Sequence, residues 1–377
     1  MSFGPLQPEH LGPPSEAEVT AWMGLSLLPG VGARTVRRWI QRAGSAEAVW
    51  GQLPAFLRPG KNHDEVLAAW RALDPAGVIA EAEVGGMAVV AQSDPAYPVL
   101  LRAIPDPPPV LFVRGTLPAG PAVAIVGARR ATAYGLAAAG RLAFDLALGG
   151  VIVTSGLARG IDGAAHQGAL DGGGRTVAVL GCGGDMIYPP EHDRLAGAIA
   201  AQGAVVTELP PGAPPLRVHF PRRNRIISGM SLGVVVVEGA TDSGALVTVD
   251  CALDQGRDVF AVPGSIFSER SRAPHALLRE GARLVESAED ILHELGLPSA
   301  GAAAPHTAGT DAASGDDATI LAALTDGPRP LDDLMELTGL PAGAVAAQVT
   351  LLEVRGLIQM LPGQMVMRTP GGKHREA

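Results

Sequence analysis

Short apolar runs alternate with helical stretches through the middle of the chain. The runs are AVAIVG near 122, VIVTSG near 151, TVAVLG near 176, AVVTE near 204, VVVVE near 234 and DVFAV near 258. Runs of this length that are rich in β-branched residues are typical of buried parallel strands, and the stretches between them are long enough for crossover helices. The pattern therefore predicts an α/β fold, a doubly wound, Rossmann-like and mostly parallel sheet, over residues 85–295.

The apolar pattern changes on either side of this domain. Upstream, apolar positions at helical spacing flank a PGVG turn and predict a small all-helical domain of helix-hairpin-helix or SAM-like type over 15–75. A Pro-rich leader at 1–14 precedes it. Downstream, small residues at 296–316 predict a flexible linker. Residues 317–370 then read as three helices and a hairpin, which is the order of a winged helix.

The composition is that of a globular protein of two or three domains, with 47% hydrophobic and 18% charged residues among 377. No apolar run approaches the ~18 residues that span a bilayer, and the N-terminus lacks a basic segment followed by an apolar one. We therefore expect a cytoplasmic protein. Cys182 and Cys251 match no metal or redox spacing and are expected to be small core residues, so no metal ion or cofactor is expected.

The flanking domains have two interpretations each. Backbone amides of the PGVG turn, with Arg34, Arg37 and Arg38 just beyond it, are suited to a phosphate, but the same small unit also serves as a packing module. The third helix of the winged-helix segment, 342–352, has no charged residue and only Gln348 as an amide side chain. A helix that reads DNA is expected to carry such side chains, so we predict a packing or protein-contact role for it.

A cluster of positive charge precedes the run near 234. The chain has a net charge of −9, yet no Asp or Glu occurs between Leu209 and Val237. Helical spacing predicts that Arg222 and Arg225 share one face and point outward, while residues 226, 227 and 230 anchor the helix. Such a face suits phosphate, and Phe220 beside it suits an unstacked base; the alternatives are surface arginines paired with distant carboxylates and an ordinary core phenylalanine. The basic residues are Arg217, His219, Arg222, Arg223 and Arg225.

Glycine-rich turns follow the first two apolar runs of the α/β domain. The turn that starts at Gly127 offers backbone amides and the Arg129 side chain to a phosphate. It lacks GxGxxG spacing, and no acidic residue ends the next strand, so a nicotinamide dehydrogenase is disfavoured. In the second turn, Gly156 permits close backbone approach, Ser155 supplies a hydroxyl and Arg159 a charge.

Six segments, in this order, resemble the DNA-processing protein A family (DprA, also called Smf). They are SGLARGIDGAAH, LGCGGDMIYPPEH, TELPPG, FPRRNRIISGMS, VVEGATDSGALVT and GRDVFAVPGS, and the resemblance covers about residues 85–290. It implies a homodimer that binds single-stranded DNA and loads the RecA recombinase in natural transformation, with single-strand-binding protein as a further candidate partner. The implied DNA groove uses Arg129, Arg159, Arg217, Phe220 and the run Arg222, Arg223, Asn224 and Arg225.

The chain departs from the family pattern at 273–278. The family usually reads Gly-x-Asn-x-Leu-Ile there, and this chain reads APHALL. The departure affects the turn at the end of the domain, whereas the basic run and the glycine-rich turns follow the pattern. The conformation of that turn and its contacts are therefore not implied by the resemblance.

A nucleoside monophosphate phosphoribohydrolase is the alternative function. Such an enzyme needs a carboxylate near the sugar, and Glu238 and Asp242 are the candidates. The segment reads EGATDSGALVT, however, where those hydrolases carry PGGxGTxxE, and both carboxylates are suited to cap a helix that begins near Ser243. We predict a binding protein rather than an enzyme, with no catalytic residues. A pure scaffold for the recombinase is the third alternative, and it predicts that charge reversal of the arginines leaves function intact.

Overall fold

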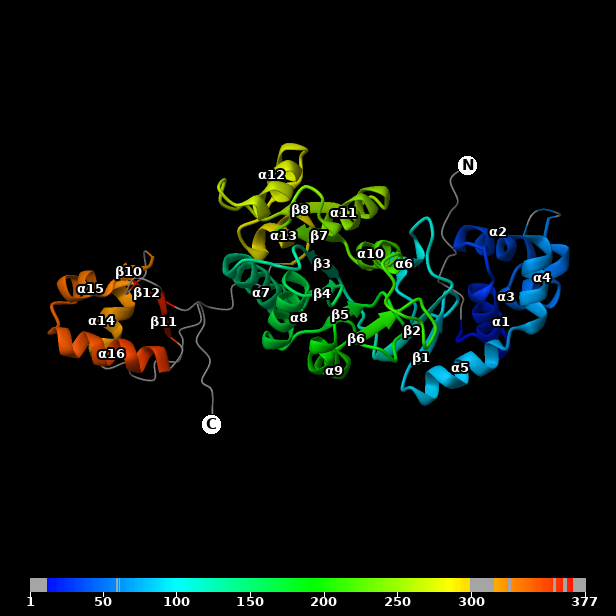
Figure 1. Cartoon of the computed structure of the whole chain (residues 1–377), viewed down its shortest axis with the longest axis horizontal. Coiled ribbons are helices and arrows are strands. Elements are labelled where there is room, and N and C mark those ends of the chain that lie inside the picture. The colour runs from blue at the N-terminus through cyan, green and yellow to red at the C-terminus, as the bar shows by residue number, and fades with distance from the viewer. Residues whose placement is uncertain are drawn as a thin grey trace. The chain divides into compact units, whose positions relative to one another are not determined.

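The computed structural model describes residues 12–58, 60, 62–298, 315–324, 327–354, 357–361 and 365–368. The chain divides into two compact units, Met1–Gly301 and Ala302–Ala377, which are described separately (Figure 1). Most of the predicted leader (1–14) and of the predicted linker (296–316) lies outside the described residues.

The first unit is built on a nine-stranded sheet with the order β1-β2-β6-β5-β4-β3-β7-β8-β9. Each predicted apolar run forms one of the strands β3 to β8, and pairing from β6 through to β9 is parallel. Strands β1 and β2, which the apolar pattern does not indicate, add an antiparallel edge beside β6. The Rossmann-like prediction is confirmed. The strands are β1 Ala88–Ala91, β2 Val110–Gly115, β3 Ala122–Val126, β4 Ile152–Ser155, β5 Thr176–Val179, β6 Ala204–Thr207, β7 Gly233–Val236, β8 Asp258–Ala261 and β9 Arg283–Leu284.

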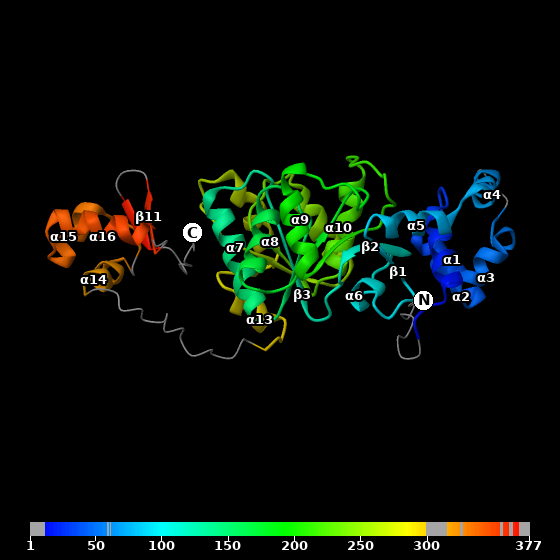
Figure 2. The same ribbon diagram turned by 90° about the horizontal axis from the view of Figure 1, so that it is seen from below.

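Helices cover both faces of this sheet (Figure 1 and Figure 2). Val123 and Ile125 of β3 pack with α7, α8 and α13, whereas Ala124 between them packs with α6, α10 and α11, because successive side chains of a strand point to opposite faces. Helices α7 and α8 approach closely, since a Cβ on Gly168 would lie 2.8 Å from the Cα of Gly140. The helices are α6 Val99–Arg102, α7 Ala133–Leu148, α8 Ile161–Asp171, η3 Pro190–His192, α9 Asp193–Gln202, α10 His219–Gly229, α11 Gly244–Asp254, η4 Glu269–Ser271, α12 Arg272–Arg279 and α13 Ala288–Glu294.

The N-terminal helices pack around Trp22, and their core also contains Val110 and Phe112 of β2. The helical region and the edge of the sheet therefore share one core. Helix α1 begins after Ser15, whose side chain accepts a hydrogen bond from the Glu18 amide at 3.1 Å, and α2 follows the PGVG turn. The helices are α1 Glu16–Leu27, α2 Ala33–Ala43, α3 Ala46–Gly51, η2 Leu53–Ala55, α4 His63–Ala72 and α5 Pro75–Val84.

The second unit has the element order of a winged helix, as predicted, with a three-stranded sheet of order β10-β12-β11. Its core contains Leu334 of α15, Val345 of α16 and Val366 of β12. The predicted turn at 362–363 lies outside the described residues. Where the chain is described, no single helix has the length and apolarity to span a membrane. The bent pair of helices Leu331–Thr338 and Ala342–Glu353 together reaches the length and apolar composition of a span. The elements are α14 Gly315–Ala323, β10 Arg329–Pro330, α15 Leu331–Thr338, α16 Ala342–Val354, β11 Ile358–Leu361 and β12 Met365–Arg368.

Candidate nucleic-acid interface

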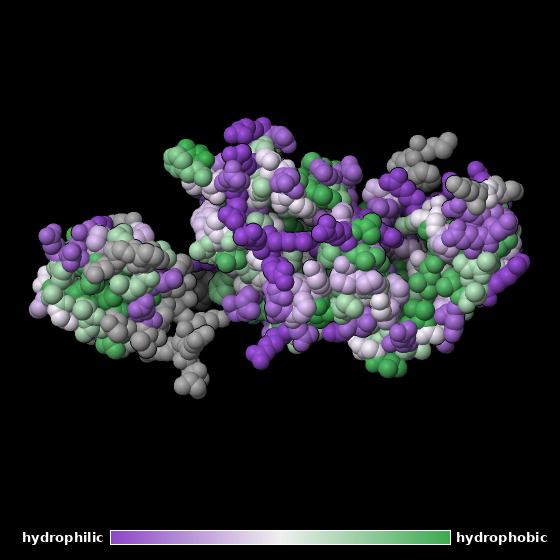
Figure 3. All heavy atoms as spheres, in the orientation of Figure 1, coloured by the Kyte–Doolittle hydropathy of each residue, from purple (hydrophilic) through white to green (hydrophobic). Residues whose placement is uncertain are grey.

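The turns that follow β3, β4 and β5 meet the start of α10 at the carboxyl ends of the parallel strands, where doubly wound sheets bind ligands. A cavity of about 730 Å³ opens there, which we call the rim cavity, and a small recess adjoins it. Figure 3 shows a band of hydrophilic side chains across the middle of this unit. The predicted residues that line the cavity are Gly127, Arg129, Arg217, Phe220, Arg223 and Asn224, and the recess adds Gly156 and Arg159.

A guanidinium and two aromatic rings lie together in the rim cavity. The Cζ of Arg129 lies 5.4 Å from the centroid of the Phe220 ring, a cation–π contact. The Tyr188 ring lies 5.7 Å from the Phe220 ring and is tilted by 46°. Arg129 and Tyr188 are exposed and Phe220 is half-buried, so this group is open to a ligand. The sequence interpretation missed Tyr188, although it lies in the motif IYPPEH.

Two further predicted arginines are exposed near this group. Arg217 lies in the loop before α10 and lines the rim cavity. Arg159 follows β4 and forms an ion pair with Glu191 through its Nε, with side chains 56% and 49% exposed. The hydrogen bond from Arg159 lowers the pKa of the Glu191 carboxyl. A pair as exposed as this one is weak, because water and salt screen it, so a phosphate can compete for the Arg159 guanidinium.

Arg223 points inward, which contradicts the expectation that it faces a ligand. Its Nη1 donates hydrogen bonds to the carbonyl oxygens of Gly156, at 2.7 Å, and Val179, and its Nε donates to Asn224 Oδ1 at 3.2 Å. Burial lowers the pKa of Arg223 to about 10, and the buried carboxylate of Asp162 opposes that shift. Arg223 therefore ties the start of α10 to the ends of β4 and β5.

Arg225 is also buried, so the predicted outward face of α10 is wrong for it. Its Nη2 lies 2.5 Å from Glu208 Oε2, and its Nε lies 3.2 Å from Asp106 Oδ2. Arg222 is 62% exposed and reaches Glu208 Oε1 at 3.3 Å. Glu208 and Asp106 come from other segments, and their carboxylates draw Arg225 inward, which helical spacing alone does not foretell.

The small residues of the turns serve packing. The Ser155 hydroxyl is fully buried and donates to the Ile125 carbonyl at 2.6 Å, so the expected hydroxyl contact with a ligand is wrong. A Cβ on Gly156 would lie 2.7 Å from Arg223 Cζ, so this glycine makes room for the arginine. Asn224 donates from Nδ2 to the Gly244 carbonyl at 3.3 Å, which engages its amide within the protein.

Glu238, one of the two carboxylates proposed for a hydrolase, has a structural role. Glu238 is buried and accepts hydrogen bonds from Thr132 N at 2.9 Å and Thr132 Oγ1 at 2.6 Å, at the start of α7. The expectation that Glu238 caps the helix near Ser243 is therefore wrong, because Ser243 caps α11 with its own hydroxyl. Asp242 is exposed.

The described ranges contain no group of three or more His, Cys, Asp or Glu side chains placed to hold a metal ion. Both cysteines are free thiols. Cys182 is buried, as expected, and burial raises its pKa to about 11, whereas Cys251 is half-buried.

Two family models and several known proteins match the chain. The family model "DNA recombination-mediator protein A" matches residues 88–296, and the model "DprA winged helix domain" matches 302–364. Protein Smf of Escherichia coli (strain K12) is 44% identical over 278 residues, 72% of this chain and 74% of that protein. Protein Smf of Synechocystis sp. is 33% identical over 396 residues, 94% of this chain and 100% of that protein.

Among solved structures, the X-ray structure of DNA processing protein A (DprA) from Streptococcus pneumoniae is similar at 33% sequence identity and a TM-score of 0.65. The match covers 74% of this chain and 98% of that chain. The family model spans the whole sheet with its rim cavity, and the second model spans most of the second unit. The chain therefore belongs to the DNA recombination-mediator protein A family, also called DprA or Smf.

Proposed function

We propose that the chain binds single-stranded DNA at the rim cavity without reading its sequence, and loads RecA recombinase in natural transformation and recombination. One observation carries the proposal: exposed Arg129 lies over the Phe220 ring beside Tyr188. An unpaired strand needs this combination, because its phosphates bind guanidinium groups and its bases stack on rings. Membership of a family of DNA recombination mediators supports the choice of ligand.

The polar groups at the rim cavity favour phosphate contacts over base reading. Among the predicted arginines, Arg129, Arg159 and Arg217 are exposed at the rim cavity or its recess, and Arg222 is exposed next to Pro221, which lines the cavity. The amide of Asn224 is engaged on both sides, by Arg223 Nε and by the Gly244 carbonyl, so it is not free to read a base edge. If each exposed arginine neutralises one phosphate, the logarithm of the binding constant should fall with the logarithm of salt concentration at a slope of about −3.

Titration of fluorescent single-stranded oligonucleotides at several salt concentrations tests the proposal. Arg129→Glu is expected to weaken binding to all sequences alike and to bring the slope toward zero by about 0.7, because one phosphate contact is lost. Phe220→Ala is expected to weaken binding by about 1–3 kcal/mol for the base it stacks, with the slope unchanged. Charge and stacking are thereby measured separately.

Arg175→Glu provides the matched control for charge. Arg175 is exposed and precedes β5, so it lies at the amino end of a strand, opposite to the rim cavity. Its reversal should leave both affinity and slope at wild-type values. A wild-type protein that bound duplex as tightly as single strands, or an Arg129→Glu variant with an unchanged slope, would rule out the proposed site.

The resemblance extends the proposal to protein partners, a homodimer and RecA. Ile266 and Phe267, in the loop after β8, are 83% and 92% exposed, and exposed apolar side chains that adjoin one another suit a protein contact. We expect sedimentation to detect a dimer of the full chain. We also expect wild-type protein, but not Arg129→Glu, to speed RecA filament formation on DNA coated with single-strand-binding protein; equal acceleration by both would favour a scaffold that needs no DNA contact.

A further inference from the structure

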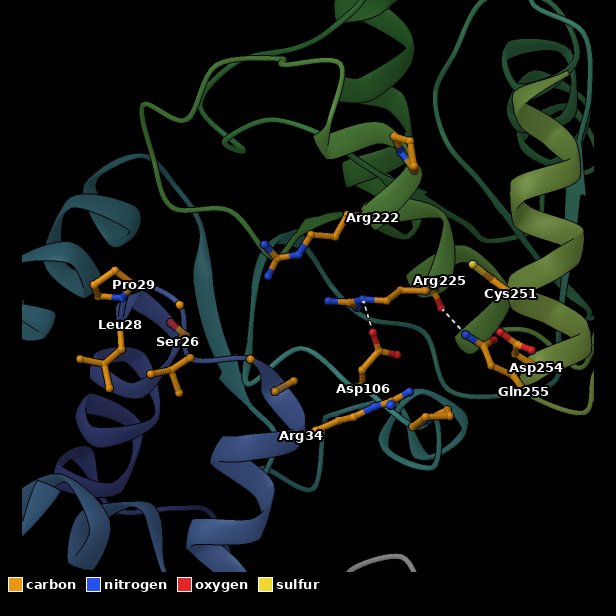
Figure 4. A pocket seen from close by; sticks show the side chains of 16 residues that line it. Ser26, Leu28, Pro29, Arg34, Asp106, Arg222, Arg225, Cys251, Asp254 and Gln255 are labelled. Atoms are coloured by element: carbon orange, nitrogen blue, oxygen red, sulfur yellow. Dashed lines mark hydrogen bonds and ion pairs between the residues drawn. The ribbon is translucent and has the colours of Figure 1, made fainter. Parts of the chain in front are cut away.

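A second cleft, of about 850 Å³, lies on the other flank of α10 from the rim cavity (Figure 4). One wall is the end of α1, the PGVG turn and the start of α2, residues 26–34, and the other comes from α10 and α11. Pro221 lines both this cleft and the rim cavity. We call it the hairpin cleft. Across this cleft the helical hairpin faces α10, the helix whose first turn carries Phe220.

The hairpin wall of this cleft is a helix N-terminus that no side chain caps. Helix α2 has 11 residues, and its N-cap residue Gly32 makes no side-chain hydrogen bond. The first turn of a helix presents free backbone amides and the positive end of the helix dipole, which favour an anion. Arg34 lies in that first turn, is exposed and lines the cleft.

A buried, unpaired donor faces the same cleft from the opposite wall. Arg225 is 8% exposed, and its Nη1 has no hydrogen-bond partner among the described residues. Figure 4 shows its guanidinium reaching into the cleft, with Arg222 beside it and Arg34 across from it. Buried donors are rarely left unpaired, because the lost hydration is not replaced. The arrangement therefore favours a ligand that supplies acceptor oxygens.

The other polar groups of the cleft limit what that ligand is. Asp106 and Asp254 also line it, and Asp106 is paired with Arg225 Nε at 3.2 Å, so the cleft is not uniformly positive. Gln255 donates from Nε2 to the Arg225 carbonyl at 3.0 Å, and its buried Oε1 has no partner within the described ranges. A free donor and a free acceptor in one cleft fit a nucleotide, which offers phosphate oxygens and base N–H groups, better than a bare anion.

We propose that the hairpin cleft holds a backbone phosphate of the same single strand that occupies the rim cavity, with the uncapped start of α2, Arg34 and Arg225 as its donors. The inference rests on the proposed function. The strand runs from the rim cavity over Pro221 and Arg222 to the PGVG turn. The helical hairpin is then part of the DNA path, and a longer strand gains a contact that a short one lacks.

Arg34→Glu tests this path in the full-length chain. Binding of oligothymidylates of about 6 and about 20 nucleotides, lengths that bracket the usual site size, is measured at several salt concentrations. We expect the variant to bind the long strand about tenfold more weakly, with a salt slope nearer zero by about 0.7, and to bind the short strand as wild type does. A glutamate in the first turn of a helix is favourable to the helix, so the variant should fold.

Arg71→Glu supplies the matched control, because Arg71 is exposed at the end of α4 in the same helical region and does not line the cleft. If Arg34→Glu bound the long strand with the same affinity as Arg71→Glu, while Arg129→Glu still weakened binding of both strands, the hairpin path would be overturned and the rim site kept. Loss of the Arg129→Glu effect would instead overturn the proposed function. Binding of inorganic phosphate that Arg34→Glu abolishes, without any effect of that variant on the long strand, would assign the cleft to a free anion and overturn the path.

Discussion

Arg223→Met is expected to lower the free energy of unfolding of the first unit by about 3–5 kcal/mol. Arg223 is buried, and its Nη1 holds the carbonyl oxygens of Gly156 and Val179 next to the buried carboxylate of Asp162. Methionine fills part of the volume but leaves these acceptors unpaired and Asp162 without its counter-charge. Urea unfolding followed by tryptophan fluorescence measures the loss, since the tryptophans at 22, 39, 50 and 70 all lie in this unit.

Arg222→Met is the control for this change, because Arg222 is the exposed neighbour on the same helix. It should change the free energy of unfolding by no more than about 0.5 kcal/mol. Adding Asp162→Asn to Arg223→Met should restore part of the loss, because the uncompensated charge is removed. If Arg223→Met and Arg222→Met unfolded at the same urea concentration, Arg223 would not be the tie between α10 and the sheet.

Arg223→Met also separates an indirect effect on DNA binding from a direct one. Phe220 lies in the first turn of α10, which Arg223 fastens to the ends of β4 and β5. Loosening this turn should weaken binding through the stacking platform and not through a lost phosphate. Arg223→Met should therefore reduce affinity with little change in the salt slope, unlike Arg129→Glu.

The sequence predicts the central sheet well because the buried parallel strands leave a plain signal. Each apolar run has apolar neighbours on both faces, as Val123 and Ala124 of β3 do, and crossover helices fix its direction. Strands β1 and β2 escape prediction because they form an antiparallel edge in a segment with many prolines, where turn signals dominate. Their place is decided by the core they share with the N-terminal helices.

The sequence predicts the kind of site, a cluster of positive charge, better than it predicts which side chains are exposed in it. Clustered charge points to the start of α10, which lines the rim cavity, but charge clustering does not say which guanidinium meets solvent. That choice depends on carboxylates from distant segments, Glu208 and Asp106 for Arg225 and Asp162 for Arg223. Tyr188 is missed for a related reason: it joins Phe220 only because the turn after β5 folds back onto α10. Tertiary contacts, not local pattern, select the residues that remain free.

His166 is expected to make the first unit sensitive to acid. It is fully buried on α8, and its Nδ1 lies 2.7 Å from Thr176 Oγ1, which itself donates to the Val153 carbonyl at 2.6 Å. Thr176 Oγ1 therefore accepts a hydrogen bond from the Nδ1–H of His166, and the ring is neutral. Burial first, and then the charges of His192 and Arg223, lower the pKa of His166 to about 3.

The lowered pKa means that the unfolded chain takes up a proton on His166 below about pH 6.5, while the folded chain does so only near pH 3. The stabilising contribution of the neutral ring is therefore complete above pH 6.5 and is lost as the pH falls toward 3. We expect His166 to cost the wild type about 2.5 kcal/mol of unfolding free energy between pH 7 and pH 4.5, and about 4 kcal/mol by pH 3.

Urea unfolding of wild type and His166→Gln at pH 7, 5.5 and 4.5 isolates this contribution, because carboxylates that titrate in the same range affect both proteins alike. Glutamine can donate to Thr176 and does not titrate, so the variant should start less stable and lose less on acidification. His293→Gln removes an exposed histidine of α13 and should follow the wild-type curve. If the free energy of unfolding fell with pH equally in wild type and His166→Gln, the His166 ring would take up its proton in the folded chain as it does in the unfolded chain. That result would contradict the lowered pKa.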